Sequence, residues 1–137
     1  MTYASHDSQL MLVCPHTCGT KFLLRPDEAR ALTRRLLEDI DPPASGHAVS
    51  DAVLVTHELV TNAIRHGGGL VAFSVTVDAD TIRVSVADHS VALPVTPRPV
   101  EPGEGGYGWA MVCTLTDTRG VTVSARGKTI AVCISLR

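Results

Sequence analysis

The sequence predicts an α+β fold: a two-layer sandwich in which an antiparallel or mixed sheet carries about three helices on one face. Two segments repeat apolar residues at the helical period. Two further regions alternate apolar and polar residues around short turns, as β-hairpins do. The order along the 137 residues is helix, helix, hairpin, loop, short helix, hairpin. Such runs of antiparallel strands with helices are typical of an α+β layer.

The composition is that of one compact domain, in which the 45% of hydrophobic residues suffices for a core. Aromatic residues make up only 4%, so aliphatic side chains must fill that core. A net charge of −2 does not favour direct nucleic-acid binding. No apolar run is long enough for a membrane span, and residues 1–9 lack a signal-peptide pattern. A cytoplasmic protein with reduced cysteines is therefore expected.

The first helix is expected to begin at Pro26, with Asp27 and Glu28 at the positive end of its dipole. Apolar residues then recur at helical spacing as far as Ile40, and Asp41-Pro42-Pro43 ends the helix. Before it, residues 21–24 have the pattern of a short strand. Residues 1–20 form an N-terminal segment, loose over 1–9 and able to add a strand, and 21–137 form the domain.

The second helix is predicted over about 50–66, with Ser50 as its N-cap and three glycines at 67–69 ending it. Val53, Val60 and Ile64 are expected to form its core stripe. The first hairpin joins 71–77 to 82–86. The second joins 121–123 to 130–136 through Arg126-Gly127.

Residues 89–108 separate the two hairpins and contain four prolines followed by four glycines. No helical or strand period runs through them. A loop of this length in a small domain is usually a functional lid or a disordered linker. A short helix is predicted directly after it, over 109–115.

The second predicted helix carries polar residues suited to nucleotide chemistry. Glu58 and Asn62 lie one turn apart on one face, with Arg65 beside them and His66 next in the chain. A carboxylate can accept a proton, an amide oxygen can hold Mg²⁺ beside phosphates, and a guanidinium can meet phosphate. Taken alone, such residues are also typical of a solvated helix surface.

Two later features favour a nucleotide site. Asp88 ends a predicted strand, where a carboxylate can accept the amino group of adenine, although a turn aspartate is common there. Gly105-Gly106-Tyr107-Gly108 leads into the short helix, where backbone N–H groups can approach phosphate, although a glycine cluster can also be a flexible loop. Their order and spacing with the helix residues indicate a nucleoside triphosphate site.

These motifs resemble those of GHKL ATPases, which share the Bergerat ATP-binding fold, and within them the bacterial anti-sigma-factor serine/threonine kinases. The stretch His57-Glu58-Leu59-Val60-Thr61-Asn62-Ala63-Ile64-Arg65-His66 matches the N-box of that group. Gly106-Tyr107-Gly108-Trp109 resembles its second glycine box, and Gly127-Lys128-Thr129 the turn before its last strand. The likeness runs from about Phe22 to Leu136, with the lid at about 89–108.

The resemblance implies a role for each matching residue. Glu58 would be the general base on a substrate serine, and Asn62 would ligate Mg²⁺. Asp88 would hydrogen-bond adenine, with Thr129 supporting it from the neighbouring strand. The other ATP contacts would come from Arg65, His66, Gly105, Gly106, Tyr107, Gly108 and Trp109.

The resemblance also implies partners. The protein would be a homodimer that holds a sigma factor inactive and phosphorylates a STAS-like anti-sigma-factor antagonist. One motif departs from the family, whose first glycine box reads Asp-x-Gly-x-Gly. Here Asp88 is followed by His89-Ser90-Val91-Ala92, without glycine. A non-catalytic partner-binding module with weak or lost nucleotide binding is therefore the alternative function.

A third hypothesis is a zinc- or thiol-dependent sensor. Cys14, His16 and Cys18 place three soft-metal ligands within five residues. A structural zinc site usually takes four ligands in pairs from two places, and Cys113 and Cys133 fall in a predicted helix and strand. The other interpretation of the N-terminal cluster is a turn with free thiols.

Overall fold

The computed structural model describes residues 2–6, 9–13, 24–94 and 108–137. The sheet contains the strands β1 (Thr2–His6), β2 (Gln9–Val13), β3 (Leu70–Asp78), β4 (Thr81–Asp88), β5 (Thr118–Ser124) and β6 (Gly127–Ser135). Its order is β1-β2-β3-β4-β6-β5, and every neighbouring pair is antiparallel. Both predicted hairpins are present, as β3–β4 and β5–β6.

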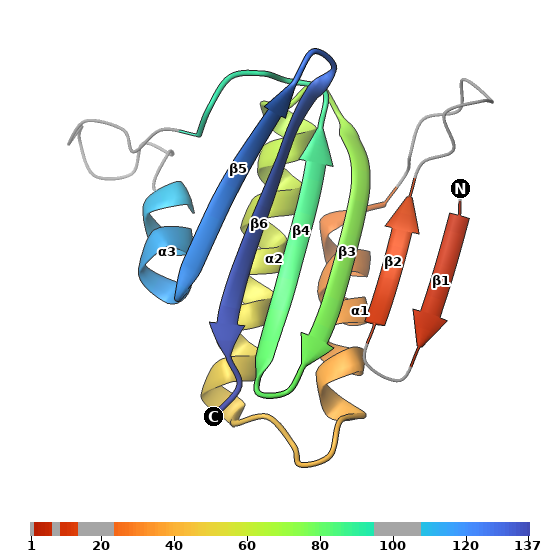
Figure 1. Ribbon diagram of the computed structural model, residues 1–137, viewed down its shortest axis with the longest axis vertical. Coiled ribbons are helices and arrows are strands. Elements are labelled where there is room, and N and C mark those ends of the chain that lie inside the picture. The colour runs from red at the N-terminus through yellow and green to blue at the C-terminus, as the bar shows by residue number, and fades with distance from the viewer. Residues whose placement is uncertain (1, 7–8, 14–23, 95–107) are drawn as a thin grey trace.

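Within the described residues three helices accompany this sheet: α1 (Pro26–Glu38), α2 (Gly46–Arg65) and α3 (Gly108–Leu115). Figure 1 shows α1 and α2 side by side behind the sheet, with α2 behind β4 and β6. Helix α3 lies at the β5 side of the sheet and contacts α2. The predicted α+β two-layer fold is confirmed. None of the helices described is long and apolar enough to cross a bilayer.

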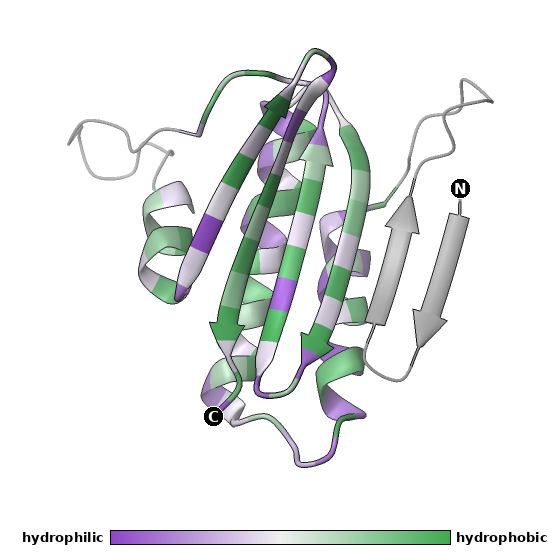
Figure 2. Cartoon of the chain, in the orientation of Figure 1, coloured by the Kyte–Doolittle hydropathy of each residue, from purple (hydrophilic) through white to green (hydrophobic). Residues whose placement is uncertain are grey.

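The core lies between α2 and the central strands. Along β4 apolar and polar residues alternate (Figure 2), and within the apolar run of β6 buried and half-buried residues alternate, because successive side chains of a strand point to opposite faces. The strand residues that are buried in this core are Leu70, Phe73, Val75, Ile82, Val84, Val86, Ile130, Val132 and Ile134. This packing holds the C-terminal end of β4 and the start of β6 near the C-terminal half of α2.

Helix α1 begins at Pro26, as predicted, and carries its acidic residues in the first turn. The backbone N–H of Arg25 donates to Glu28 Oε1 at 3.1 Å, which satisfies one of the free groups at the helix start. Thr33 of α1 and Thr56 of α2 are fully buried, and their hydroxyl oxygens lie 3.1 Å apart. A single polar contact therefore joins two otherwise apolar helix faces.

The prediction for α2 was wrong in two respects. The helix begins at Gly46, and Ser45 is its N-cap, since Ser45 Oγ accepts from the backbone N–H of Ala48 at 3.0 Å. Of the expected core stripe only Val60 is buried, whereas Ile64 is 44% exposed. The buried row consists of Ala48, Ala52, Val55, Thr56, Leu59, Val60 and Ala63. Alanines contribute little to an apolar pattern, so the larger apolar residues predict a stripe on the adjacent side of the helix.

The N-terminal residues also differ from expectation. Residues 2–6 and 9–13 form β1 and β2, a hairpin that extends the sheet at β3, where a loose start was expected over 1–9. Leu24 belongs to no strand, and the rest of the strand expected at 21–24 lies outside the described residues. Of the lid expected at 89–108, only 89–94 and Gly108 are described.

Candidate functional site

A cavity of about 940 Å³ lies between α2, the end of β4, the start of β6 and the first turn of α3. Its lining includes most of the described residues that the sequence indicated: Glu58, Asn62, Arg65, His66, Asp88, Gly108 and Trp109. It also includes Lys128, which was not predicted as a site residue. The structure thus brings the helix motif, the strand-end aspartate and the start of α3 to one cavity.

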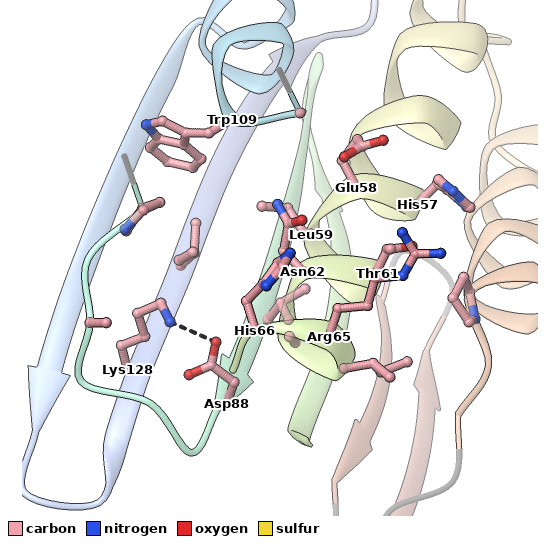
Figure 3. A pocket seen from close by; sticks show the side chains of 18 of the residues that line it. His57, Glu58, Leu59, Thr61, Asn62, Arg65, His66, Asp88, Trp109 and Lys128 are labelled. Carbon is pink, nitrogen blue, oxygen red and sulfur yellow. Dashed lines mark hydrogen bonds and ion pairs between the residues drawn. The ribbon is translucent and has the colours of Figure 1, made fainter. Parts of the chain in front are cut away.

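Helix α2 places its polar residues along the cavity. Glu58 and Asn62 lie one turn apart on α2, and His66, the C-cap residue just beyond the helix, continues the four-residue spacing. Figure 3 shows Asp88 and Lys128 across from Asn62 and His66, while the Arg65 side chain extends along α2 away from them. Arg65 therefore contributes positive charge at the flank of the cavity rather than beside Asp88.

Asp88 forms a buried ion pair with Lys128. The Lys128 Nζ lies 2.8 Å from Asp88 Oδ2, and the two side chains are only 8% and 6% exposed. The pair arises because Asp88, the last residue of β4, lies opposite Lys128 in the antiparallel register with β6. A buried charge without a partner would be strongly unfavourable, so each member of the pair compensates the burial of the other at the cavity wall.

The structure does not bring Thr129 to Asp88. Thr129 lies opposite Ala87 in the register between β4 and β6. Successive residues of a strand point to opposite faces, so Thr129 points away from the face that carries Lys128. In this structure the strand neighbour that supports Asp88 is Lys128 in place of the expected Thr129.

The segment that replaces the first glycine box folds back onto Asp88. The backbone N–H of Ser90 donates to Asp88 Oδ1 at 2.9 Å, and the N–H of Ala92 donates to Ser90 Oγ at 3.1 Å. Side chains thus form the turn by bonding to nearby backbone groups, as aspartate and serine commonly do. Within the described residues each oxygen of the Asp88 carboxylate has one protein partner, and neither partner is a glycine N–H.

Two glycines allow other segments to approach Asp88 closely. A Cβ atom at Gly67, just after α2, would overlap Asp88 Oδ2. A Cβ atom at Gly127 would overlap the main-chain oxygen of Asp88, and its φ of +152° is also unfavourable for other residues. The sequence pattern at 67–69 predicts only a helix end, and the contact of Gly67 with Asp88 arises from the folding of the chain.

Glu58 lies where α2 meets α3. A Cβ atom at Gly108 would overlap Glu58 Oε2, so this carboxylate lies against the first turn of α3. The free N–H groups and the dipole of a helix start favour a negative charge there. The contact places Glu58 at the end of the cavity opposite Asp88.

The donor set fits a nucleotide with a divalent cation. The Asn62 amide oxygen and the Glu58 carboxylate oxygens, both at the cavity, are hard ligands of the kind Mg²⁺ accepts beside phosphates. Across the described part of the chain, no three or more His, Cys, Asp or Glu side chains form a metal-binding group. Cys113 and Cys133 are free and half-buried. The remaining predicted residues lie outside the described ones: Cys14, His16, Cys18, Gly105, Gly106 and Tyr107.

Comparison with known proteins assigns the class. The model of the histidine kinase-like ATPase domain matches residues 23–134, most of the chain, so the protein belongs to this family. The GHKL resemblance is thereby confirmed. A crystal structure titled as the RsbU and RsbW domains of Rv1364c from Mycobacterium tuberculosis superposes with a TM-score of 0.64 at 22% identity. The match covers 93% of this chain but only 32% of the solved one, and at this identity it supports the fold alone. No curated protein matches significantly.

Proposed function

We propose that the protein binds ATP with Mg²⁺ and is an anti-sigma-factor-like kinase that phosphorylates a serine or threonine of an antagonist protein. The observation that carries the proposal is the shared cavity of Glu58, Asn62 and Asp88 within a histidine kinase-like ATPase domain. These three residues come from two elements and meet at one cavity only in the folded chain.

The base and phosphate ends are assigned by the chemistry of the side chains. Asp88 retains acceptor capacity for the amino group of adenine, because a carboxylate can accept about four hydrogen bonds and the described residues use two. Asn62 would hold Mg²⁺, and the cation would neutralise charge on the phosphates. Arg65 and His66 add donors along the same helix. Phosphoryl transfer depends mainly on such positioning and charge neutralisation.

Glu58 is the general base in this proposal. Its carboxylate accepts the proton of the substrate hydroxyl while that oxygen forms a bond to the γ-phosphorus. The bond from this phosphorus to the bridging oxygen breaks, and ADP leaves. The contact of Glu58 with the first turn of α3 holds the carboxylate at the phosphate end of the cavity.

The likeness of the N-box to anti-sigma-factor kinases supports the proposed partners. These are a sigma factor, which the protein would hold inactive, and a STAS-like antagonist, which would be the phosphoryl acceptor. In this proposal the protein acts as a cytoplasmic homodimer. Phosphorylation of the antagonist would then decide which of the two partners the protein binds.

The test compares Glu58→Gln with wild type for Mg-ATP binding by calorimetry and for transfer of labelled phosphate to candidate antagonists. Loss of a general base is expected to reduce transfer at least ~100-fold, with ATP affinity within about threefold of wild type. Glu38→Gln, on the exposed side of α1, is the matched control. Equal transfer by Glu58→Gln and wild type would exclude the base role.

One observation favours the second candidate, a partner-binding module without catalysis. Both oxygens of Asp88 already have protein partners, so a nucleotide base must share or displace them. This candidate predicts no Mg²⁺-dependent ATP binding at millimolar nucleotide while sigma-factor binding persists. Saturable binding of Mg-ATP would exclude it.

A further inference from the structure

The Lys128 side chain is buried and also lines the cavity. Among the residues whose burial is described, Asp88 and Lys128 are the only buried charged side chains. Ion pairing alone would explain them if they lay in the core. They line the cavity instead, at the end opposite the contact between Glu58 and Gly108.

The pair keeps hydrogen-bonding capacity on both members. An ammonium group has three donors, and within the described residues Lys128 Nζ makes one hydrogen bond, to Asp88 Oδ2. Asp88 has acceptor capacity left beyond Lys128 and the Ser90 N–H. The donor Lys128 Nζ and the acceptor Asp88 Oδ2 thus lie 2.8 Å apart at the cavity wall.

We propose that Lys128 contacts the nucleobase and that the Lys128–Asp88 pair admits guanine as well as adenine nucleotides. This rests on the proposed function, in which a nucleotide lies in this cavity with its base at Asp88. Adenine presents an amino donor next to a ring-nitrogen acceptor. Guanine presents a carbonyl acceptor next to a ring N–H donor. Its hydrogen-bond donor and acceptor are therefore exchanged in position relative to those of adenine.

A lone carboxylate would discriminate between these bases. With the base kept in one position, the carboxylate accepts from the adenine amino group but faces the guanine carbonyl without a donor, and such unpaired polar groups are strongly rejected. With Lys128 beside Asp88, the carbonyl receives a charged hydrogen bond and the ring N–H donates to the carboxylate. Lys128 is therefore the residue that sets base specificity.

The test measures binding of Mg-ATP, Mg-GTP and Mg-ITP to the full chain by calorimetry. Wild type is expected to bind ATP and GTP with Kd values within about tenfold of each other, since the pair satisfies either base. ITP, which has the carbonyl and ring N–H of guanine but no amino group, is expected to behave as GTP does. This wild-type ratio decides the inference without any variant.

The variant Lys128→Met removes the hydrogen-bond donor. It is expected to weaken the binding of GTP and ITP at least ~10-fold more than the binding of ATP, which is the usual effect of losing a charged hydrogen bond. Lys128→Arg keeps a donor and is expected to retain GTP binding. Arg126→Met, in the exposed β5–β6 turn, is the matched control and should leave all three affinities unchanged. Thermal unfolding verifies that each variant is folded.

Contrary outcomes separate this inference from the proposed function. If wild type binds Mg-ATP but binds Mg-GTP at least ~100-fold more weakly, the inference is overturned, whereas the proposed ATP binding is supported. Tighter binding of both nucleotides by Lys128→Met would show that Lys128 obstructs the cavity, which also overturns the inference. If no nucleotide binds to wild type, the proposed function fails and the inference fails with it.

Discussion

At the scale of single residues, Asp88 depends on close packing around its carboxylate. Gly67 leaves room for Asp88 Oδ2, and its carbonyl oxygen accepts from the His89 N–H at 2.9 Å. These contacts join the end of α2 to the end of β4. A residue that appears in the sequence only as a helix terminator thus positions the acceptor at the base end of the cavity.

The variant Gly67→Ala is expected to destabilise the fold by about 1–3 kcal/mol, the usual cost of overpacking, because the new methyl group overlaps Asp88. ATP affinity should fall as the carboxylate moves. Urea denaturation and calorimetry measure the two effects.

Gly46→Ala is the control at the other end of α2, because a Cβ atom there meets nothing within 4 Å. It should leave affinity unchanged and stabilise the helix by up to ~1 kcal/mol. Wild-type stability and affinity in Gly67→Ala would contradict the role assigned to Gly67.

At the scale of elements, the packing of α1 on α2 holds one buried hydrogen bond, between Thr33 and Thr56. Both side chains are 0% exposed, so neither hydroxyl group can turn to water. Removal of one partner leaves the other buried hydroxyl without this bond, whereas removal of both leaves an apolar contact of similar shape. The effects of substituting Thr33 and Thr56 on the free energy of unfolding are therefore expected to be coupled.

Thr33→Val and Thr56→Val are each expected to lower the free energy of unfolding by about 1–3 kcal/mol. The double variant should be less destabilised than the sum of the single variants. A double-mutant cycle by urea denaturation measures the coupling. Additive single effects would mean that the hydroxyl groups find other partners and do not depend on each other.

At the scale of the whole molecule, stability is concentrated in the middle of the sheet. Strand β4 pairs with β3 and β6, and Ile82, Val84 and Val86 are at most 3% exposed. Among the strands that the structure describes, β5 pairs only with β6, at the edge of the sheet (Figure 1). All but one of the β5 residues are exposed. The cavity lies at one end of the stable centre, so Asp88 and Lys128 are held by its best-packed strands.

Amide hydrogen exchange is expected to be slowest in β4 and at least ~10-fold faster in β5, because local opening is easiest where few apolar groups are buried. Exchange measured by NMR on the free protein tests this. Equal protection of β4 and β5 would indicate that the edge strand opens only with the whole fold.

Much of this protein follows from local sequence. Local signals predict the start of α1 at Pro26, the two hairpins, and the placement of Glu58 and Asn62 on one helix. These signals are the spacing of apolar residues and the turn residues, which lie within a few positions of one another. Such signals act over short distances in the chain, so they can be recognised in the sequence without the tertiary structure. The family likeness of the N-box depends on the same local stretch and was confirmed.

Only the tertiary structure decided which side chains meet. Lys128 and Asp88 are 40 positions apart and pair through the register of β4 with β6, which no local pattern determines. A shift of one residue in that register would exchange the faces of Lys128 and Thr129, since side chains alternate along a strand. The buried side of α2 was likewise decided by packing, because its alanines are buried while Ile64 remains exposed. The sequence by itself determined the elements and the helix motif, and the sheet register and helix packing determined the partner of Asp88.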